Sequence, residues 1–263
     1  MPADDKKISI AVPGEWMLQK VLGPVLSEMG EDLKKVYAKG RDKISSRAYG
    51  KIPDPDDGKQ ANLRVARDVF WNGSFSDDEV CAEYFGGMLA SSRSGDGKDD
   101  SAIQFVDVCK SLSSRQLRLH YVIYNSLNKL MVASGKQVNI LSNEIRSTHV
   151  YFSGVELMML KIDVMLDTTV LLRQDLLSGW KSEIKMGDLL LPHLLINPTT
   201  FGVMLYAAAH NRLSKFNSFH KVDFGDFDNV ALPKHYASTL PELVQSHPPL
   251  DDLVRGDQPP PNA

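Results

Sequence analysis

Residues 113–135 read SSRQLRLHYVIYNSLNKLMVASG, and the fold class follows first from this segment. Apolar residues recur in it at spacings of three and four, the period of an amphipathic helix that packs on a core. Ser113 or Ser114 can cap the first turn, and Gly135 can end the helix in a left-handed C-cap. We therefore predict one long helix. Its apolar positions are Leu117, Leu119, Val122, Ile123, Leu127, Leu130 and Met131.

The residues before this segment show the same helical spacing. A helix is expected over 14–47, interrupted at Gly23-Pro24 because a proline inside a helix removes a backbone donor. Further helices are expected over 60–72 and from Ala102 to Lys110. Together they predict a mainly α-helical domain over 14–135.

Turn and cap signals separate these helices. Residues 53–58, Pro-Asp-Pro-Asp-Asp-Gly, have the composition of a turn. Ser76 and Glu79 have capping-box spacing, so Ser76 is expected to be the N-cap of the next helix. Residues 91–101 are polar and rich in glycine and serine, which predicts a flexible loop.

The pattern beyond residue 136 is mixed. Residues 151–177 fit one long helix, and 189–196 form a buried apolar segment. Residues 201–210 fit either a strand and turn or a helix, and their three consecutive alanines favour the helix. With short strands near Leu191 and Phe201, we predict a smaller mixed α+β, winged-helix-like part over 136–225. The apolar positions assigned to the long helix are Val155, Met158, Met159, Ile162, Leu166 and Val170.

Charge is unevenly distributed along the chain. The 263 residues carry a formal charge of −3, with 43% hydrophobic and 24% charged residues, a composition typical of globular proteins. From residue 223 onward there are two basic and seven acidic residues, and half of the 14 prolines. We therefore predict an acidic, Pro-rich extended tail over 226–263 that is disordered towards its end. The preceding 222 residues carry a net charge of +2.

We find no segment with the pattern of a signal peptide or of a membrane helix in the sequence. The N-terminal residues are polar, and the most apolar run, 189–196, is well short of the ~20 residues of a membrane helix. Two cysteines in a chain of this length fit a reducing compartment. We expect a cytoplasmic protein without stable membrane insertion.

Four groups of residues could carry chemistry, and for each the structural interpretation is favoured. Cys81 and Cys109 are expected to be buried core residues rather than reactive thiols. No two histidines have the four-residue spacing of a helical metal pair. We predict no catalytic, cofactor-binding or metal-ligating residues. The remaining candidates are an acidic turn with Asp223, Asp226 and Asp228, and a basic, solvated helix face with Lys34, Lys35, Lys39, Arg41, Lys43, Arg47 and Lys51.

Four segments stand out by their order and spacing: residues 21–33 running into 37–41, then 77–90, 105–117 and 194–202. Together they resemble the abortive-infection alpha (Abi-alpha) family of bacterial proteins over about residues 15–210, and their order and spacing, more than any single motif, carry the resemblance. In the second segment Tyr84 and Gly86-Gly87 replace the family's usual Trp and Ala, and in the third the usual acidic residue is replaced near Arg115 or Gln116.

The resemblance implies a role in defence against phage, with no established catalytic residues to carry over. We therefore expect a non-enzymatic protein that acts through protein contacts. A nucleic-acid-binding regulator that uses a winged-helix-like second part is the alternative, and the slightly basic 136–222 segment favours it mildly. A hydrolase built on scattered Asp, Glu and His is a third hypothesis.

Overall fold

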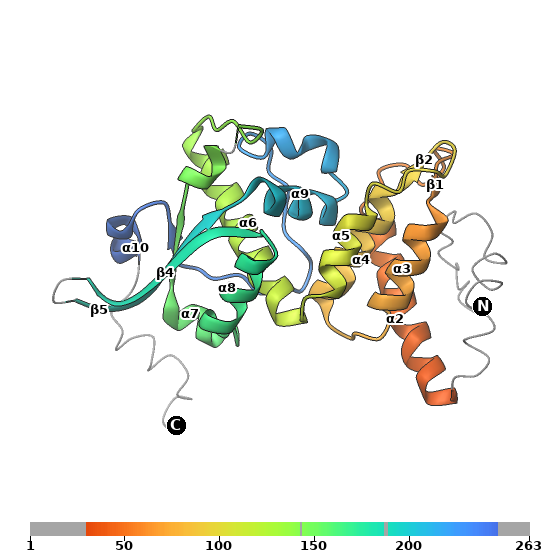
Figure 1. The fold of residues 1–263 in the computed structure, drawn as a ribbon, viewed down its shortest axis with the longest axis horizontal. Coiled ribbons are helices and arrows are strands. Elements are labelled where there is room, and N and C mark those ends of the chain that lie inside the picture. The colour runs from red at the N-terminus through yellow and green to blue at the C-terminus, as the bar shows by residue number, and fades with distance from the viewer. Residues whose placement is uncertain (1–29, 143, 187–188, 247–263) are drawn as a thin grey trace, which may run out of the picture.

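The computed structural model describes residues 30–142, 144–186 and 189–246 (Figure 1). Over these residues the fold is mixed α+β and mainly helical, with one small antiparallel sheet beside the helices and a separate two-stranded pair. This coarse class agrees with the sequence-based prediction.

The first half of the described chain is helical apart from the short antiparallel pair. In Figure 1 its helices run from α2 at one end of the molecule to α6 near the centre. The elements are α2 (Glu31–Gly50), β1 (Gln60–Ala61), α3 (Leu63–Gly73), α4 (Glu79–Ser91), β2 (Arg93–Ser94), α5 (Ile103–Lys110) and α6 (Ser114–Ser134).

The prediction for α6 is confirmed in detail. Ser113 is its N-cap, and its hydroxyl accepts from the Gln116 amide at 3.3 Å. The Gln116 side chain accepts from the Ser113 amide at 2.9 Å, which completes a capping box. Gly135 ends the helix with φ +63°, a conformation that glycine adopts without strain.

Three boundaries in this half differ from the prediction. Residues 60–61 form β1 and pair with β2, so the helix begins at Leu63, with Asn62 as its N-cap. The same pairing places a strand inside the predicted 91–101 loop. The N-cap of α4 is Asp78, whose carboxylate accepts from the Val80 amide at 2.9 Å, and Ser76 instead accepts from the Asp78 amide. For the predicted 14–47 helix, α2 confirms residues 31–47, and the interruption at 23–24 lies outside the described residues.

The second half combines the sheet with short helices. The strands lie in the order β4-β5-β3-β6, and each neighbouring pair is antiparallel. The elements are η1 (Glu144–Ser147), β3 (Val150–Ser153), α7 (Gly154–Met159), α8 (Val164–Arg173), β4 (Leu177–Met186), β5 (Leu189–Pro198), α9 (Thr200–Ala209), η2 (Leu213–Ser218), β6 (Tyr236–Ala237) and α10 (Leu240–Ser246).

The prediction of one long helix over 151–177 is wrong. Residues 150–153 form β3, because Val150 and Phe152 are buried and the strand pairs with residues 193–196 of β5. Ser153 then caps α7, and a turn with Lys161 at φ +60° separates α7 from α8. The strand expected near Leu191 is present as β5. Phe201 lies in α9, a helix capped by Thr199, and not in a strand.

Residues 226–246, the described part of the predicted extended tail, include a strand and a helix and are therefore not extended throughout, whereas the end that was expected to be disordered lies outside the described residues. β6 adds to the edge of the sheet beside β3, and α10 follows it. Ala237 and Leu243 are buried against Leu191, which supplies the apolar contact that anchors the segment. Residues 247–263 lie outside the described residues.

One hydrophobic core contains residues from both sides of residue 135, from Tyr37 to Phe227. Side chains of α4, α6 and α9 make up its centre, and α4 is buried along nearly its whole length. The division into units 14–135, 136–225 and 226–263 stays a prediction. Among the described residues, no helix is both long enough and apolar enough to cross a membrane.

Candidate interaction surface

The most exposed group of large apolar side chains lies on α7 and α8, two short helices that contact each other, with α8 next to β4 (Figure 1). We call this the α7–α8 surface. Its side chains are between 40% and 71% exposed, whereas the chain buries most other residues of these types. Exposed apolar groups gathered in one place mark interaction sites more often than exposed residues scattered singly. They are Met158, Met159, Met165, Leu166 and Leu172.

The outward face of α8 follows from helical spacing. Met165, Leu166, Thr169, Leu172 and Arg173 lie at positions i, i+1, i+4, i+7 and i+8 and are all exposed. Residues 167, 168 and 171 point the other way and are fully buried. The helix therefore has a polar-and-apolar buried face and an outward face made mainly of apolar side chains.

Hydrogen bonds to Asp167 fix α8 on the body of the protein. Its carboxylate is buried and accepts from Arg115 Nε at 2.7 Å and from the Asp163 amide at 3.0 Å. Asp163 in turn caps the helix by accepting from the Leu166 amide at 3.1 Å. Because Arg115 lies in the first turn of α6, this network ties α8 to the central helix.

A second buried carboxylate fixes α7. Glu156 accepts from the backbone amides of Lys234 and His235 at 3.2 and 2.8 Å, and its carboxylate lies 2.9 Å from His235 Nδ1. This contact joins α7 to the segment that leads into β6. The α7–α8 surface is thus held from both ends by side chains distant in sequence, and sequence reasoning missed both anchors.

The charges on this surface are few. Lys161, between the helices, and Arg173, in the last turn of α8, are both exposed and form no ion pair with any described residue. Asp163 is occupied as the N-cap, and Asp167 is neutralised by Arg115. The surface is therefore apolar, with two cations that lack an ion pair at its ends and the capping carboxylate of Asp163 beside Lys161.

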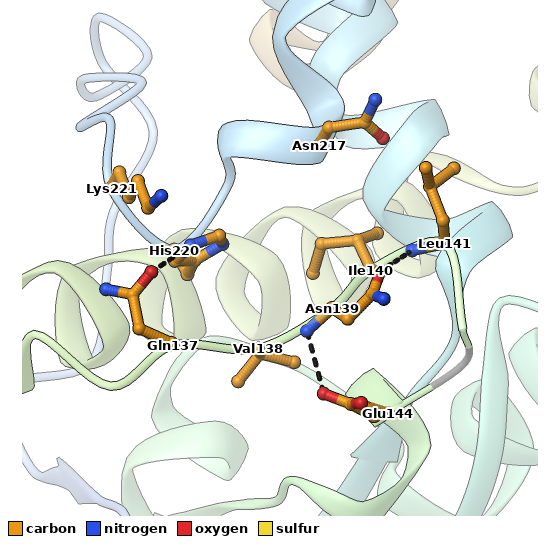
Figure 2. A pocket seen from close by; sticks show the side chains of 9 residues that line it. All are labelled: Gln137, Val138, Asn139, Ile140, Leu141, Glu144, Asn217, His220 and Lys221. Carbon is orange, nitrogen blue, oxygen red and sulfur yellow. Dashed lines mark hydrogen bonds between the residues drawn. The ribbon is translucent and has the colours of Figure 1, made fainter.

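A cavity of about 370 Å³ lies elsewhere, between the segment after α6 and the turn after η2 (Figure 2). His220 Nε2 lies 3.1 Å from Gln137 Oε1, and the Glu144 carboxylate accepts from the Asn139 amide at 2.9 Å. Burial, and secondarily the charge of Lys221, lowers the pKa of His220. These polar groups mainly bond to one another, so the cavity suits a small polar molecule but does not assemble an acid, a base and a nucleophile.

Both cysteines line a second, smaller cavity of about 190 Å³. They are free and buried, as the sequence analysis expected. Burial raises the pKa of the Cys81 thiol to about 11 and that of Cys109 well above its usual value. Both groups are therefore protonated at neutral pH, which makes them poor nucleophiles.

The acidic cluster at 223–228 is divided among separate partners. Asp226 accepts from Asn125 Nδ2 at 2.9 Å and pairs with Lys129 at 2.7 Å. Asp228 pairs instead with Arg47 at 3.1 Å. No group of three or more metal-ligating side chains occurs within the described ranges. The cluster holds the 223–228 segment against α2 and α6.

Only the second part of the basic stretch on α2 departs from the expected solvated face. Lys43 and Arg47 pair with Glu79 of α4 at 2.9 and 2.8 Å, and Arg47 and Lys51 pair with the nearly buried Glu83. Lys34, Lys35 and Arg41 pair only with acidic residues of α2 itself, and the exposed Lys39 pairs with Asp77 before α4, so this part is solvated as expected. The sequence contains a pattern that could have indicated the interface with α4, because Lys43, Arg47 and Lys51 repeat every four residues, and so do Glu79 and Glu83.

Four histidines, His120, His193, His210 and His220, are buried. His120 Nδ1 lies 2.5 Å from the Tyr84 hydroxyl inside the core, and burial lowers the pKa of His120 to about 3. Tyr124 packs against His120, and Tyr206 packs against Tyr124 and Tyr121, so the pair belongs to an aromatic cluster that sequence spacing did not reveal. Buried and closely packed, it is part of the core.

Comparisons of the chain with known protein families, with curated proteins and with solved structures found no match.

Proposed function

We propose that this chain is a non-catalytic binding protein that engages a protein partner through the α7–α8 surface. The setting that we propose is defence against phage in the bacterial cytoplasm, as the resemblance to the Abi-alpha family implies. The observation that supports binding is the outward apolar face of α8, which Arg115 of α6 holds in place through Asp167, beside α7, which Glu156 fixes to the segment before β6.

The element order favours a winged-helix-like module for this part. A helix, α6, is followed by a strand, two short helices and a long hairpin, with the three strands in the order β4-β5-β3. In such a module α8 takes the place of the recognition helix, and the β4–β5 hairpin takes the place of the wing. The proposal therefore assigns binding to the element that this arrangement presents outward.

The chemistry of α8 favours a protein over a nucleic acid as the partner. Recognition helices that enter a DNA groove use Arg, Lys and polar side chains to contact phosphates and base edges. α8 presents Met165, Leu166 and Leu172, with Arg173 as its one basic residue. Removing such apolar side chains from water is what stabilises protein interfaces.

Phage plating tests this function. The wild-type chain should reduce plating on a sensitive host, and the double variant Met165→Glu with Leu172→Glu should abolish the reduction, because charges cannot be buried in an apolar interface. Leu33→Glu is the matched control, since Leu33 is 46% exposed but lies on α2, far from this surface in Figure 1. Plating unaffected by the wild-type chain across several phage types would refute the defence role. Full protection by the double variant would refute the surface.

A nucleic-acid-binding regulator is the second candidate, because the helix–helix–hairpin order favours it. In this case Arg173 and Lys181 of the hairpin would contact phosphates, although Lys181 pairs with Glu183. A gel shift with duplex DNA separates the two functions. Binding that falls steeply with salt supports the regulator, and our proposal expects no such complex.

A further inference from the structure

We infer that the α7–α8 surface binds an acidic amphipathic helix of the partner protein. The inference rests on the proposed function and specifies the partner's chemistry.

The apolar part of the surface suits a helical segment. Three of its five apolar side chains are methionines, whose flexible thioethers adapt to the shape of an incoming side chain. α8 has ten residues and is therefore about 15 Å long, which matches roughly three turns of a partner helix. An amphipathic helix offers apolar anchors at i, i+3, i+4 and i+7 along that length.

The charges select an acidic helix. Lys161 lies just before α8 and Arg173 in its last turn, so the two cations bracket the apolar face. Neither has a carboxylate partner among the described residues, whereas the nearby Asp167 and Asp175 pair with Arg115 and Arg146. Carboxylates placed two to three turns apart on a partner helix would meet both cations.

The same charges disfavour a second copy of the chain. A symmetric dimer brings the same patch of both subunits together. Four cations without an ion pair would then meet across the interface, while of the exposed carboxylates nearby Asp163 already caps α8 and Asp175 already pairs with Arg146. The chain itself also contains an acidic apolar run, Leu250-Asp-Asp-Leu253-Val254, beyond the described residues, so the experiment must separate binding within the chain from binding to a partner.

Fluorescence anisotropy with synthetic peptides tests the inference on the full chain. The probe is a labelled amphipathic helix of about 18 residues, with Leu on one face and Glu on its flanks, and its control carries Lys in place of every Glu. We expect the Glu peptide to bind more tightly, and its affinity to fall with salt. The double variant Lys161→Glu with Arg173→Glu should weaken binding of the Glu peptide about tenfold and improve binding of the Lys peptide, because attraction between the surface and each peptide charge becomes repulsion and the reverse. Lys98→Glu, an exposed cation elsewhere, is the control and should change neither.

Several results would overturn the inference. Equal binding of both peptides would show that charge plays no part. A concentration-dependent dimer that Met165→Glu disrupts would identify a second copy as the occupant. If the Glu peptide binds only to the full-length variant Leu250→Ser with Leu253→Ser, the chain's own 250–254 run would be the occupant of the surface. Absence of peptide binding, with phage protection still lost in the Met165→Glu, Leu172→Glu variant, would refute the acidic partner and leave the proposed function standing.

Discussion

The substitution of Gly87 by alanine should destabilise this protein, although alanine is the better helix former. Gly87 lies in α4 where that helix crosses the end of α9. A Cβ atom at Gly87 would lie 1.9 Å from the Ala209 carbonyl oxygen and 2.3 Å from its carbonyl carbon. Both contacts are with backbone atoms, so no side-chain rotation can relieve them.

The size of the effect follows from the distance. Restoring a van der Waals separation of about 3.5 Å requires α4 and α9 to move apart by roughly 1.5 Å. The helices cannot do so without loosening the core, and overpacking of this kind costs about 1–3 kcal/mol or more. The gain in helix propensity offsets about 1 kcal/mol. Because the overlap is with backbone atoms that cannot rotate away, we take the upper end of this range, about 3 kcal/mol, and expect a net loss of about 2 kcal/mol in the free energy of unfolding.

Urea unfolding followed by circular dichroism measures this loss. Gly50→Ala is the control, because Gly50 is the last residue of α2 and a methyl group there would have no neighbouring atom within 4 Å, so it should stabilise slightly, by up to about 0.5 kcal/mol. The two substitutions add the same methyl group and should have opposite signs. If Gly87→Ala is as stable as the wild type, the close approach of α4 and α9 is refuted.

Three further predictions concern the core and its caps. Glu83→Gln leaves the largely buried Lys51 without its carboxylate partner and should lower the free energy of unfolding by about 3 kcal/mol. The double variant Lys51→Met with Glu83→Leu removes both charges and should lower it by less, which the midpoints of urea unfolding will show. Because burial lowers the pKa of His120 to about 3, the unfolded chain binds a proton below about pH 6.5 that the folded chain excludes. Stability should therefore fall as pH drops through this window, by about 2.5 kcal/mol between pH 7 and 4.5, and His120→Gln should flatten that slope in unfolding curves measured at both pH values. Ser113→Ala removes the capping box of α6 and should cost about 1 kcal/mol in thermal unfolding, and an unchanged midpoint would contradict the cap assignment.

Residues 151–177 show where sequence reasoning failed. Met158, Met159 and Leu166 recur at helical spacing and are among the apolar positions of the predicted long helix, yet all three are exposed. Spacing identifies the side chains that share a face, but the neighbouring segments determine whether that face is covered. In this protein β3 pairs with β5, some 40 residues later, and that pairing divides the predicted helix.

The interaction surface could therefore not be predicted from the sequence. Its apolar residues are visible in the sequence, but their exposure depends on contacts with distant segments: Arg115 binds Asp167 of α8, and the backbone at 234–235 binds Glu156 of α7. The sequence partly indicated the α2–α4 ion pairs, because the basic residues and the glutamates each repeat every four residues. It did not indicate that these two helices pack against each other.

Local chemistry in the chain is sufficient to place α6, α5 and most of α3, since caps, turns and helical spacing act within a few residues. It also leads to the mainly helical class and the buried thiols of Cys81 and Cys109. Contacts between distant segments place the sheet, the crossing at Gly87 and the outward face of α8. These features depend on which surfaces meet, because burial and strand pairing are satisfied between elements and not within them.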